Sequence, residues 1–112
     1  MIRVERHPLV RRDLRELVRH VAETSGDKRA AARRLDEVEA LLASILEDPR
    51  SGPYLADRLS GWRVRHEGKG RMLTIVFRLT DQEDCVQVAV VAFGGQDWMG
   101  RVASRKDYFS EE

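Results

Sequence analysis

The first half of the chain carries two amphipathic stripes with the period of an α-helix. Residues 2–7 alternate weakly between apolar and polar side chains, which predicts a short strand. The first stripe follows directly and consists of Val10, Leu14, Leu17, Val18 and Val21. The second stripe lies between a turn at 25–27 and Pro49 and consists of Ala31, Leu35, Val38, Leu42 and Ile45. Because the turn between them is short, the two stripes predict an antiparallel helical hairpin.

The second half of the chain changes to the period of a β-strand. Trp62, Val64 and His66 alternate there with Arg63 and Arg65, which is the pattern of a strand. After a glycine-containing turn at 67–70, the next strand places its apolar side chains on one face, namely Leu73, Ile75, Phe77 and Leu79. A polar turn at 80–84 leads into a third strand that ends near Phe93. These three strands predict an antiparallel meander.

The predicted order of elements is therefore β-α-α-β-β-β. We expect an α+β fold of two layers, in which the helical hairpin packs on one face of a small, mainly antiparallel sheet. The single predicted domain spans residues 1–97, and residues 98–112 form either a short helix or a frayed C-terminal tail. No internal repeat, low-complexity segment or long linker divides the chain.

Composition narrows the class of protein. The 112 residues suffice for one domain, and 42% of them are apolar, which excludes a disordered chain. No apolar run approaches the ~20 residues of a membrane span, and the first residues lack the apolar region of a signal peptide. The single cysteine, Cys85, excludes an intramolecular disulfide and fits a reducing compartment. We therefore expect a cytoplasmic protein with no membrane partner.

The net charge of +1 argues against strong non-specific binding to nucleic acid, but the charges are unevenly distributed. Residues 1–34 carry ten basic and five acidic side chains, whereas residues 35–60 carry two basic and six acidic ones. Residues 61–80 carry five basic side chains and one acidic one, and residues 81–100 carry four acidic ones and no basic one. A directional electrostatic surface and ordinary solvated faces are both open interpretations of these alternating blocks.

Signatures of metal binding and of common catalytic sites are absent from the sequence. His7, His20 and His66 have no metal-ligand spacing among themselves or with Cys85, which we interpret as a half-buried thiol. The glycine–lysine–glycine run at 68–70 precedes a strand and lacks the spacing of a phosphate-binding loop. We expect neither a metal nor a cofactor.

The hairpin from residue 62 to residue 79 carries the most informative chemistry. Arg63 and Arg65 are two residues apart and project from the same face of their strand. If Arg78 of the next strand shares that face, the three arginines form a cationic concavity. Such a concavity can hold phosphate with paired hydrogen bonds and can stabilise developing negative charge. The alternative is that these arginines pair with acidic residues of neighbouring segments.

Four stretches occur in an order and at spacings that match a known family. They are the helical hairpin with its exit at 48–52, the strand entry at 59–65, the strand at 72–78 and the stretch at 88–97. Together, over residues 3–97, they resemble the RelE/ParE superfamily of bacterial type II toxin–antitoxin toxins. The long helical hairpin resembles that of the ParE branch.

The resemblance implies a small toxin that a cognate antitoxin neutralises. ParE-like members are non-enzymatic inhibitors of DNA gyrase, whereas RelE-like members are endoribonucleases that cut mRNA in the ribosomal A site. We expect a ParE-like toxin that arrests growth by binding a macromolecular target, gyrase. The alternatives are a ribosome-dependent mRNA endoribonuclease of the RelE type and a non-toxic binding module of the same fold.

The resemblance also suggests roles for basic residues. Arg63 and Arg65 occupy the stretch in which RelE-like members hold and cleave RNA. The candidate catalytic residues are Arg63, Arg65 and Arg78. The candidate residues for binding RNA or another target are Lys69, Arg71, Arg101 and Arg105.

Two departures from the RelE-like pattern favour the ParE interpretation. Gly95 and Gln96 stand where the family usually has a basic residue, and Val102 stands where a tyrosine is expected. Tyr108 lies further along the chain. His66 is a candidate base for RNA cleavage, although alternation along its strand places it on the face opposite the strand's arginines.

Large apolar residues near the C-terminus are candidates for binding the antitoxin. They are Trp98, Met99 and Tyr108. An exposed apolar patch can receive a partner helix or strand, and packing of the tail onto the core is the alternative. The partners expected are the cognate antitoxin and either gyrase or the ribosome with its mRNA, with no small-molecule cofactor.

Overall fold

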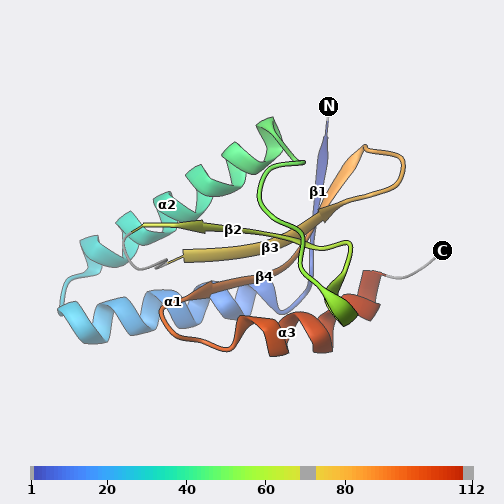
Figure 1. Ribbon diagram of the computed structural model, residues 1–112. Helices are drawn as coiled ribbons and strands as arrows, with labels where there is room; N and C mark the ends of the chain where they lie inside the picture. Colours follow the sequence, from blue (N-terminus) through green and yellow to red (C-terminus); the bar gives the residue numbers. More distant parts are fainter. Residues whose placement is uncertain (1, 69–72, 110–112) are drawn as a thin grey trace.

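The order of helices and strands is the predicted one. The structure is a computed structural model of the chain and describes residues 2–68 and 73–109. Its main elements are β1 (Arg3–Arg6), α1 (Val10–Ser25), α2 (Lys28–Glu47), β2 (Arg63–Glu67), β3 (Leu73–Leu79), β4 (Cys85–Phe93) and α3 (Trp98–Arg105) (Figure 1). A 3-10 helix at Asp57–Leu59 precedes β2, and another at Lys106–Phe109 follows α3. The predicted α+β fold is confirmed.

The turn between α1 and α2 is defined by two residues with complementary roles. Gly26 adopts a φ of 69°, and its N–H donates to the carbonyl of Ala22 at 2.8 Å. This left-handed cap ends α1, and glycine adopts it without steric cost. The Asp27 side chain then accepts a hydrogen bond from the N–H of Arg29 at 2.9 Å, which caps the start of α2.

The four strands form one mixed sheet in the order β1-β4-β3-β2. β1 pairs with β4 in parallel, and β4 with β3 and β3 with β2 pair antiparallel. The sheet is therefore mainly antiparallel, as predicted, and β4, the last strand of the meander, lies between β1 and β3. The register between β3 and β4 shifts after Val76, so that Ala89 of β4 is an additional residue on its side of the ladder.

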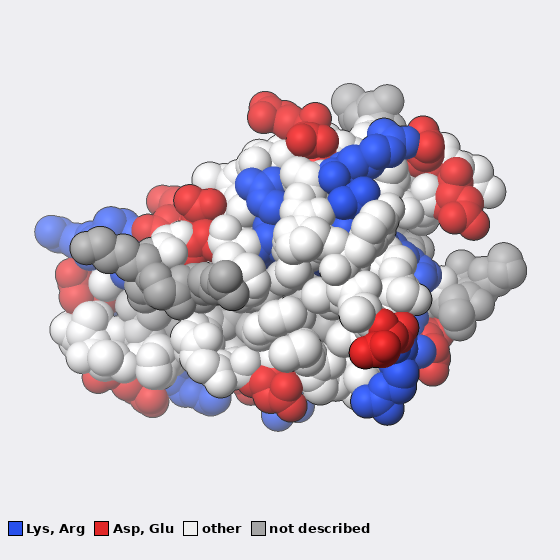
Figure 2. Space-filling view, viewed as in Figure 1, with Lys and Arg blue, Asp and Glu red and all other residues white. Residues whose placement is uncertain are grey.

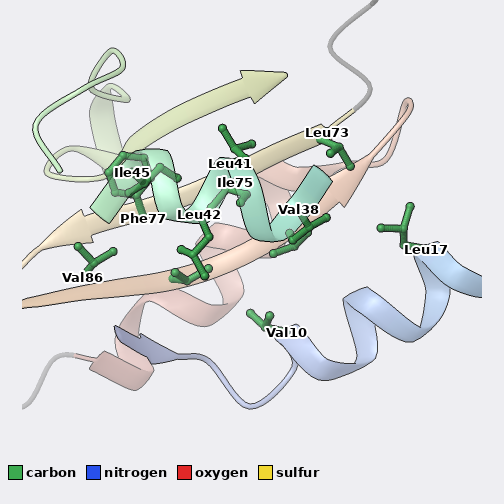
Figure 3. Packing of buried hydrophobic residues seen from close by; sticks show 12 residues of the cluster. Val10, Leu17, Val38, Leu41, Leu42, Ile45, Leu73, Ile75, Phe77 and Val86 are labelled. Carbon is green, nitrogen blue, oxygen red and sulfur yellow. The ribbon is translucent and has the colours of Figure 1, made fainter. Parts of the chain in front are cut away.

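The helical hairpin covers one face of the sheet, as predicted. Figure 3 shows side chains of α1 and α2 pointing toward those of β3 and β4. The buried members of this cluster, the hairpin-side core, are Val10, Leu17, Val38, Leu41, Leu42, Ile45, Leu73, Ile75, Phe77, Val86, Val88 and Val91. Every one of these side chains is apolar, so burial of apolar surface holds the hairpin to the sheet.

The opposite face of the sheet is covered by the C-terminal segment. Residues 98–105 form α3, and its Val102 packs with Phe109 on residues of β2, β3 and β4. The buried members of this second cluster, the α3-side core, are Trp62, Val64, Val76, Ala89, Val90, Ala92, Val102 and Phe109. The sheet therefore has no large open face within the described residues.

Candidate functional site

Arg63 and Arg65 of β2 lie on the hairpin side of the sheet. In the antiparallel pairing of β2 with β3, Arg63 is opposite Phe77 and Arg65 is opposite Ile75. Directly opposed residues of antiparallel strands share a face, and both partners belong to the hairpin-side core. Because β2 is the edge strand, the two guanidinium groups reach sideways to the segment that links α2 to β2.

Arg78 lies on the other face, over the α3-side core. Its guanidinium carbon is 4.6 Å from the centroid of the Trp62 ring. Its Nε donates to Oε1 of Gln87 at 2.8 Å, and its Nη2 donates to the carbonyl of Phe109 at 3.1 Å. The prediction that Arg78 shares an open face with the two β2 arginines is wrong. The antiparallel register places it one residue out of phase with them, and α3 and the 3-10 helix after it cover its face.

The β2 arginines are held by neutral oxygens. Arg63 Nη1 donates to the carbonyl of Gly52 at 2.7 Å, and its guanidinium carbon is 3.8 Å from the centroid of the Tyr54 ring. Arg65 donates to the hydroxyls of Ser51 at 2.6 Å and Ser44 at 3.0 Å. Neither arginine forms an ion pair with any acidic residue that the structure describes. The alternative prediction of pairing with acidic residues does not hold within the described part of the chain, where both positive charges at the sheet edge lack a counterion.

The segment that carries these oxygens requires a glycine. Gly52 has a φ of 84°, and a Cβ there would collide with the backbone carbonyl of Val64. Close approach of this segment to β2 brings the Gly52 carbonyl within reach of Arg63. We call Arg63, Arg65, Tyr54 and the 50–52 segment the β2 edge.

A small hollow opens at the β2 edge. It has a volume of about 190 Å³ and is lined by Arg50, Tyr54, Gly61, Arg63, Leu79, Thr80, Asp81 and Glu83. Arg50 and Glu83 form an ion pair across it at 2.5 Å. Pockets that enclose a small-molecule ligand usually exceed ~300 Å³. The hollow at the β2 edge is therefore too small to enclose such a ligand.

Arg105, a candidate for target binding, is instead buried against Asp13 of α1. Two of its guanidinium nitrogens donate to the Asp13 carboxylate at 2.7 and 3.0 Å, and one also donates to the carbonyl of Ala89 at 3.0 Å. Arg101, which is half-buried, contacts the same carboxylate at 3.3 Å, and the N–H of Val91 donates to it at 3.1 Å. The Arg105 guanidinium therefore connects α3 with α1 and β4 and is not presented to a partner.

Sequence reasoning did not assign Asp13 a role, although a signal was present. Asp13 lies three residues after Val10 and four before Leu17, within the apolar stripe of α1. A carboxylate within the apolar stripe faces the core when the helix packs by that stripe, and a buried carboxylate requires hydrogen-bonding or charged partners. The identity of its partner, 92 residues away in the chain, carries no sequence signal.

The remaining candidates are scattered. His66 Nδ1 is 2.9 Å from the hydroxyl of Thr74, and its ring lies 5.8 Å from that of Trp98, on the α3 side as alternation predicted. Trp98 is half-buried against the α3-side core, whereas Met99 and Tyr108 are exposed. Lys69 and Arg71 lie outside the described residues.

Among the described residues, neither the thiol of Cys85 nor the acidic side chains form a further reactive or metal-binding site. Cys85 is buried, not half-buried, at the start of β4, and desolvation is the main cause that raises the pKa of its thiol. A raised pKa lowers the fraction of reactive thiolate. Among the described residues, no group of His, Cys, Asp and Glu could hold a metal ion.

Comparison with protein families decides the relationship of the chain to known proteins. A family model described as the ParE toxin of the type II toxin–antitoxin system parDE matches residues 4–98. The chain belongs to the ParE toxin family. The predicted membership of the RelE/ParE superfamily is thereby confirmed, including the branch that its long helical hairpin favoured. No curated protein sequence matches it significantly.

Solved structures show that the ParE-family chain shares its fold with RelE-type toxins. One is the toxin–antitoxin complex RelBE2 from Mycobacterium tuberculosis, with a TM-score of 0.59, 22% identity, and coverage of 83% of this chain and 98% of that one. Another is a mutant of the E. coli toxin RelE in the free state, with a TM-score of 0.61, 13% identity, and coverage of 96% and 97%. At such identities the likeness concerns the fold.

The ParE-family chain departs from the RelE-like pattern at described positions beyond β4. Gln96 uses its side-chain oxygen to accept from the N–H of Phe93 at 3.1 Å, which ties the residues that follow the strand. Val102, which stands where the RelE-like pattern has a tyrosine, is completely buried in the α3-side core and carries no hydroxyl.

Among the described residues, no helix is both long and apolar enough to cross a membrane.

Proposed function

We propose that this ParE-family toxin arrests growth by binding and inhibiting DNA gyrase, without cleaving nucleic acid itself. It is a member of a type II toxin–antitoxin family, and membership implies a cognate antitoxin. The choice of a binding mechanism rests on the distribution of its candidate catalytic groups.

The separation of the arginines from the candidate base carries the proposal. Cleavage of RNA by its own 2′-hydroxyl needs a base and a cation within reach of the same phosphate. Here Arg63 lies on the hairpin side of the sheet and His66 on the α3 side, bonded to Thr74. His66 and the two β2 arginines therefore do not lie around one phosphate, and Arg78, which shares the α3 side with His66, is bonded instead to Gln87 and to the carbonyl of Phe109.

The β2 edge offers a plausible contact for a macromolecular target. Among residues 2–68 and 73–109, Arg63 and Arg65 have no acidic partner, and Tyr54 is 63% exposed beside Arg63. Arginine and tyrosine are enriched among the residues that dominate binding energy at protein interfaces. We propose that this edge contacts gyrase.

Two assays on the purified full-length toxin separate the functions. We expect inhibition of DNA supercoiling by gyrase and intact mRNA in a translating extract. Cleavage of mRNA at A-site codons with unaffected supercoiling would establish the RelE-like alternative and overturn the proposal. Absence of both effects, together with harmless induced expression, would favour a non-toxic binding module.

A double variant tests the β2 edge within this function. Arg63→Gln with Arg65→Gln should raise the concentration needed for half-inhibition of supercoiling at least about tenfold, since each hot-spot truncation costs roughly 1–2 kcal/mol. Arg58→Gln is the control, because Arg58 is exposed in the neighbouring 3-10 helix and also carries one charge. Equal inhibition by the double variant, with unchanged circular dichroism, would remove the β2 edge from the target interface.

We further propose that the antitoxin covers the face over α3. Figure 2 shows that the middle of this face carries few charges and that most charges lie along its rim. Met99 is 54% exposed on α3, and Tyr108 is 55% exposed after it. Met99→Glu should weaken antitoxin binding in a titration of the purified pair. Unchanged affinity would place the antitoxin elsewhere.

A further inference from the structure

The outer side of α1 carries a ridge of four arginines. They are Arg11, Arg12, Arg15 and Arg19, and all four are exposed. Because the α-helix has 3.6 residues per turn, these positions fall within about 100° around its axis, opposite the stripe that packs on the sheet. We call this surface the α1 ridge. It is built from residues that the gyrase proposal does not use.

The positive charge of the α1 ridge is only partly neutralised. Arg12 forms an ion pair with Glu16 at 3.4 Å, and Glu16 also contacts Arg101 at 3.5 Å. Arg11, Arg15 and Arg19 form no ion pair with the acidic residues that the structure describes. The ridge therefore presents about three uncompensated charges on one rigid element.

Acidic residues flank the ridge without closing it. Glu39 of α2 and Arg11 line a groove of about 520 Å³ between the two helices, to which Arg6, His7 and Leu14 also contribute. Glu23 lies one turn beyond Arg19 on α1. Glu16 is nearer, because it lines a hollow with Arg12, Arg15 and Arg19, but its carboxylate is engaged by Arg12 and Arg101, so an extended anion can still follow the ridge.

The spacing of the ridge suits a series of phosphates. Arg11, Arg15 and Arg19 are separated by four residues each, so their Cα atoms advance by about 6 Å per step along the helix. Each guanidinium can donate two parallel hydrogen bonds to one phosphate. A duplex carries one phosphate charge per ~1.7 Å of its axis, so a ridge of this length always has phosphates within reach.

The composition of the ridge favours nucleic acid over protein as the partner. Protein interfaces depend on a buried apolar or aromatic centre, whereas interfaces with nucleic acid are more polar and strongly basic. The large exposed apolar residues of the described chain are Leu9, Tyr54, Met99 and Tyr108, and none of them lies in α1. The nearest of them is Leu9, the N-cap residue of α1, so a partner protein would find little apolar surface to bury along the line of arginines.

We propose that the α1 ridge binds the phosphate backbone of a nucleic-acid duplex. The contact is independent of base sequence, because phosphates carry no sequence information. It is also modest, because the net charge of the chain is only +1. The inference stands whichever target the toxin inhibits. DNA and RNA duplexes share the chemistry that the ridge recognises.

Fluorescence anisotropy of the full-length toxin with a 20-base-pair DNA duplex, and with an RNA duplex of the same sequence, tests the proposal. Three phosphate contacts predict a slope of about −2.7 for log K against log salt, or roughly 40-fold weaker binding between about 50 and 200 mM KCl. The triple variant Arg11→Gln, Arg15→Gln, Arg19→Gln should bind at least ~10-fold more weakly at low salt and show a slope near zero.

A control variant with the same change of charge decides whether the effect is local. Lys28→Gln, Arg29→Gln and Arg33→Gln also remove three positive charges, from exposed positions of α2. This variant should keep most of the affinity. Equal weakening by both variants would attribute binding to net charge and overturn the site.

Two further outcomes discriminate among partners. Preference for the DNA or the RNA duplex identifies the source of the phosphates, and either preference supports the ridge. Binding of both duplexes that is unaffected by the triple variant overturns the proposal. Weaker antitoxin binding by that variant, with unchanged duplex affinity, would make the ridge a protein interface instead.

Discussion

The two faces of the sheet are covered in different ways. On the hairpin side, α1 and α2 contribute the apolar side chains of the hairpin-side core, as Figure 3 illustrates, and Asp13 of α1 is the one charged side chain of the described hairpin that is buried. On the other side, the eight residues of α3 contribute Val102 to the buried apolar cluster and Arg105 to a buried ion pair with Asp13. A short helix buries little apolar area, so directional bonds contribute more to its position.

The two attachments differ in how well they tolerate substitutions. Apolar packing degrades gradually when a methylene group is lost. A buried ion pair adds little net stability when intact, yet removing one partner leaves an uncompensated buried charge. We therefore expect α3 to be sensitive to single changes in its polar contacts, including a change of its partner Asp13 on α1, and the apolar residues of the hairpin to be sensitive mainly to changes of volume.

The largest effect should follow from Asp13→Ala. The substitution leaves the buried guanidinium of Arg105 with the neutral carbonyl of Ala89 but without the Asp13 carboxylate, and it leaves the N–H of Val91 without its acceptor. We expect the free energy of unfolding to fall by about 3–5 kcal/mol. Urea denaturation measures it, and Glu16→Ala, which breaks half-exposed pairs, is the control at under ~1 kcal/mol. A cost for Asp13→Ala as small as that of the control would show that the ion pair does not hold α3.

A smaller effect should follow from Ile45→Val on the hairpin side. Ile45 is completely buried in α2, and the change removes one methylene group. We expect a loss of about 0.5–1.5 kcal/mol in the same denaturation experiment. If this conservative change costs more than Asp13→Ala, the ranking of the two faces is reversed.

Arg101→Gln should have a still smaller effect. The Arg101 side chain is 28% exposed, and its contacts with Asp13 and Glu16 are long, at 3.3 and 3.5 Å. Asp13 keeps Arg105 after the change, so we expect a loss of about 0.2–1 kcal/mol. A loss comparable to that of Asp13→Ala would mean that the half-exposed arginine, and not the buried one, fixes α3.

The smallest effect concerns pH. His7 precedes α1, accepts from the N–H of Leu9 through Nδ1 at 3.0 Å, and stacks edge-on against Tyr108 at 4.9 Å. Desolvation and then the charge of Arg105 lower the pKa of His7, and Asp13 opposes them. The folded state therefore binds a proton less readily than the unfolded state.

The sign of the pH dependence follows from this lowered pKa. The His7 contribution to stability is complete above the unfolded-state pKa of about 6.5 and is lost as the pH falls through the folded-state pKa. His7→Asn keeps a side-chain acceptor for Leu9 but does not titrate. The wild type should lose more stability than this variant between about pH 7.5 and 5. Equal losses would show that His7 does not couple proton binding to folding.

Much of the fold could be predicted because its signals are local. The stripe from Val10 to Val21 and the alternation around Ile75 each identify an element within a dozen residues. The caps at Gly26 and Asp27 mark the turn of the hairpin. Each of these assignments depends on residues close together in the chain, and the structure confirms the elements they predicted.

The candidate site could not be predicted to the same extent, because it depends on register and on distant pairing. Alternation showed that Arg63 and Arg65 share a face, but only the pairing with Phe77 and Ile75 shows which face it is. The Asp13–Arg105 pair joins residues 92 positions apart. The sequence therefore identified Arg63, Arg65 and Arg105 as candidates, but it did not reveal that Arg105 is buried.

The position of β4 has a consequence for the time at which the chain becomes functional. β4 is the last strand of the meander and the strand that pairs with β1, and the residue paired with Arg3 is Cys85. During synthesis, β1 has no neighbour in the sheet until the last strand has emerged, although the hairpin can form much earlier. Pairing over such separations also slows folding. The delay between synthesis of β1 and completion of the sheet therefore follows from the topology. Substitutions that change only the stability of the fold should not alter the order in which the strands can pair.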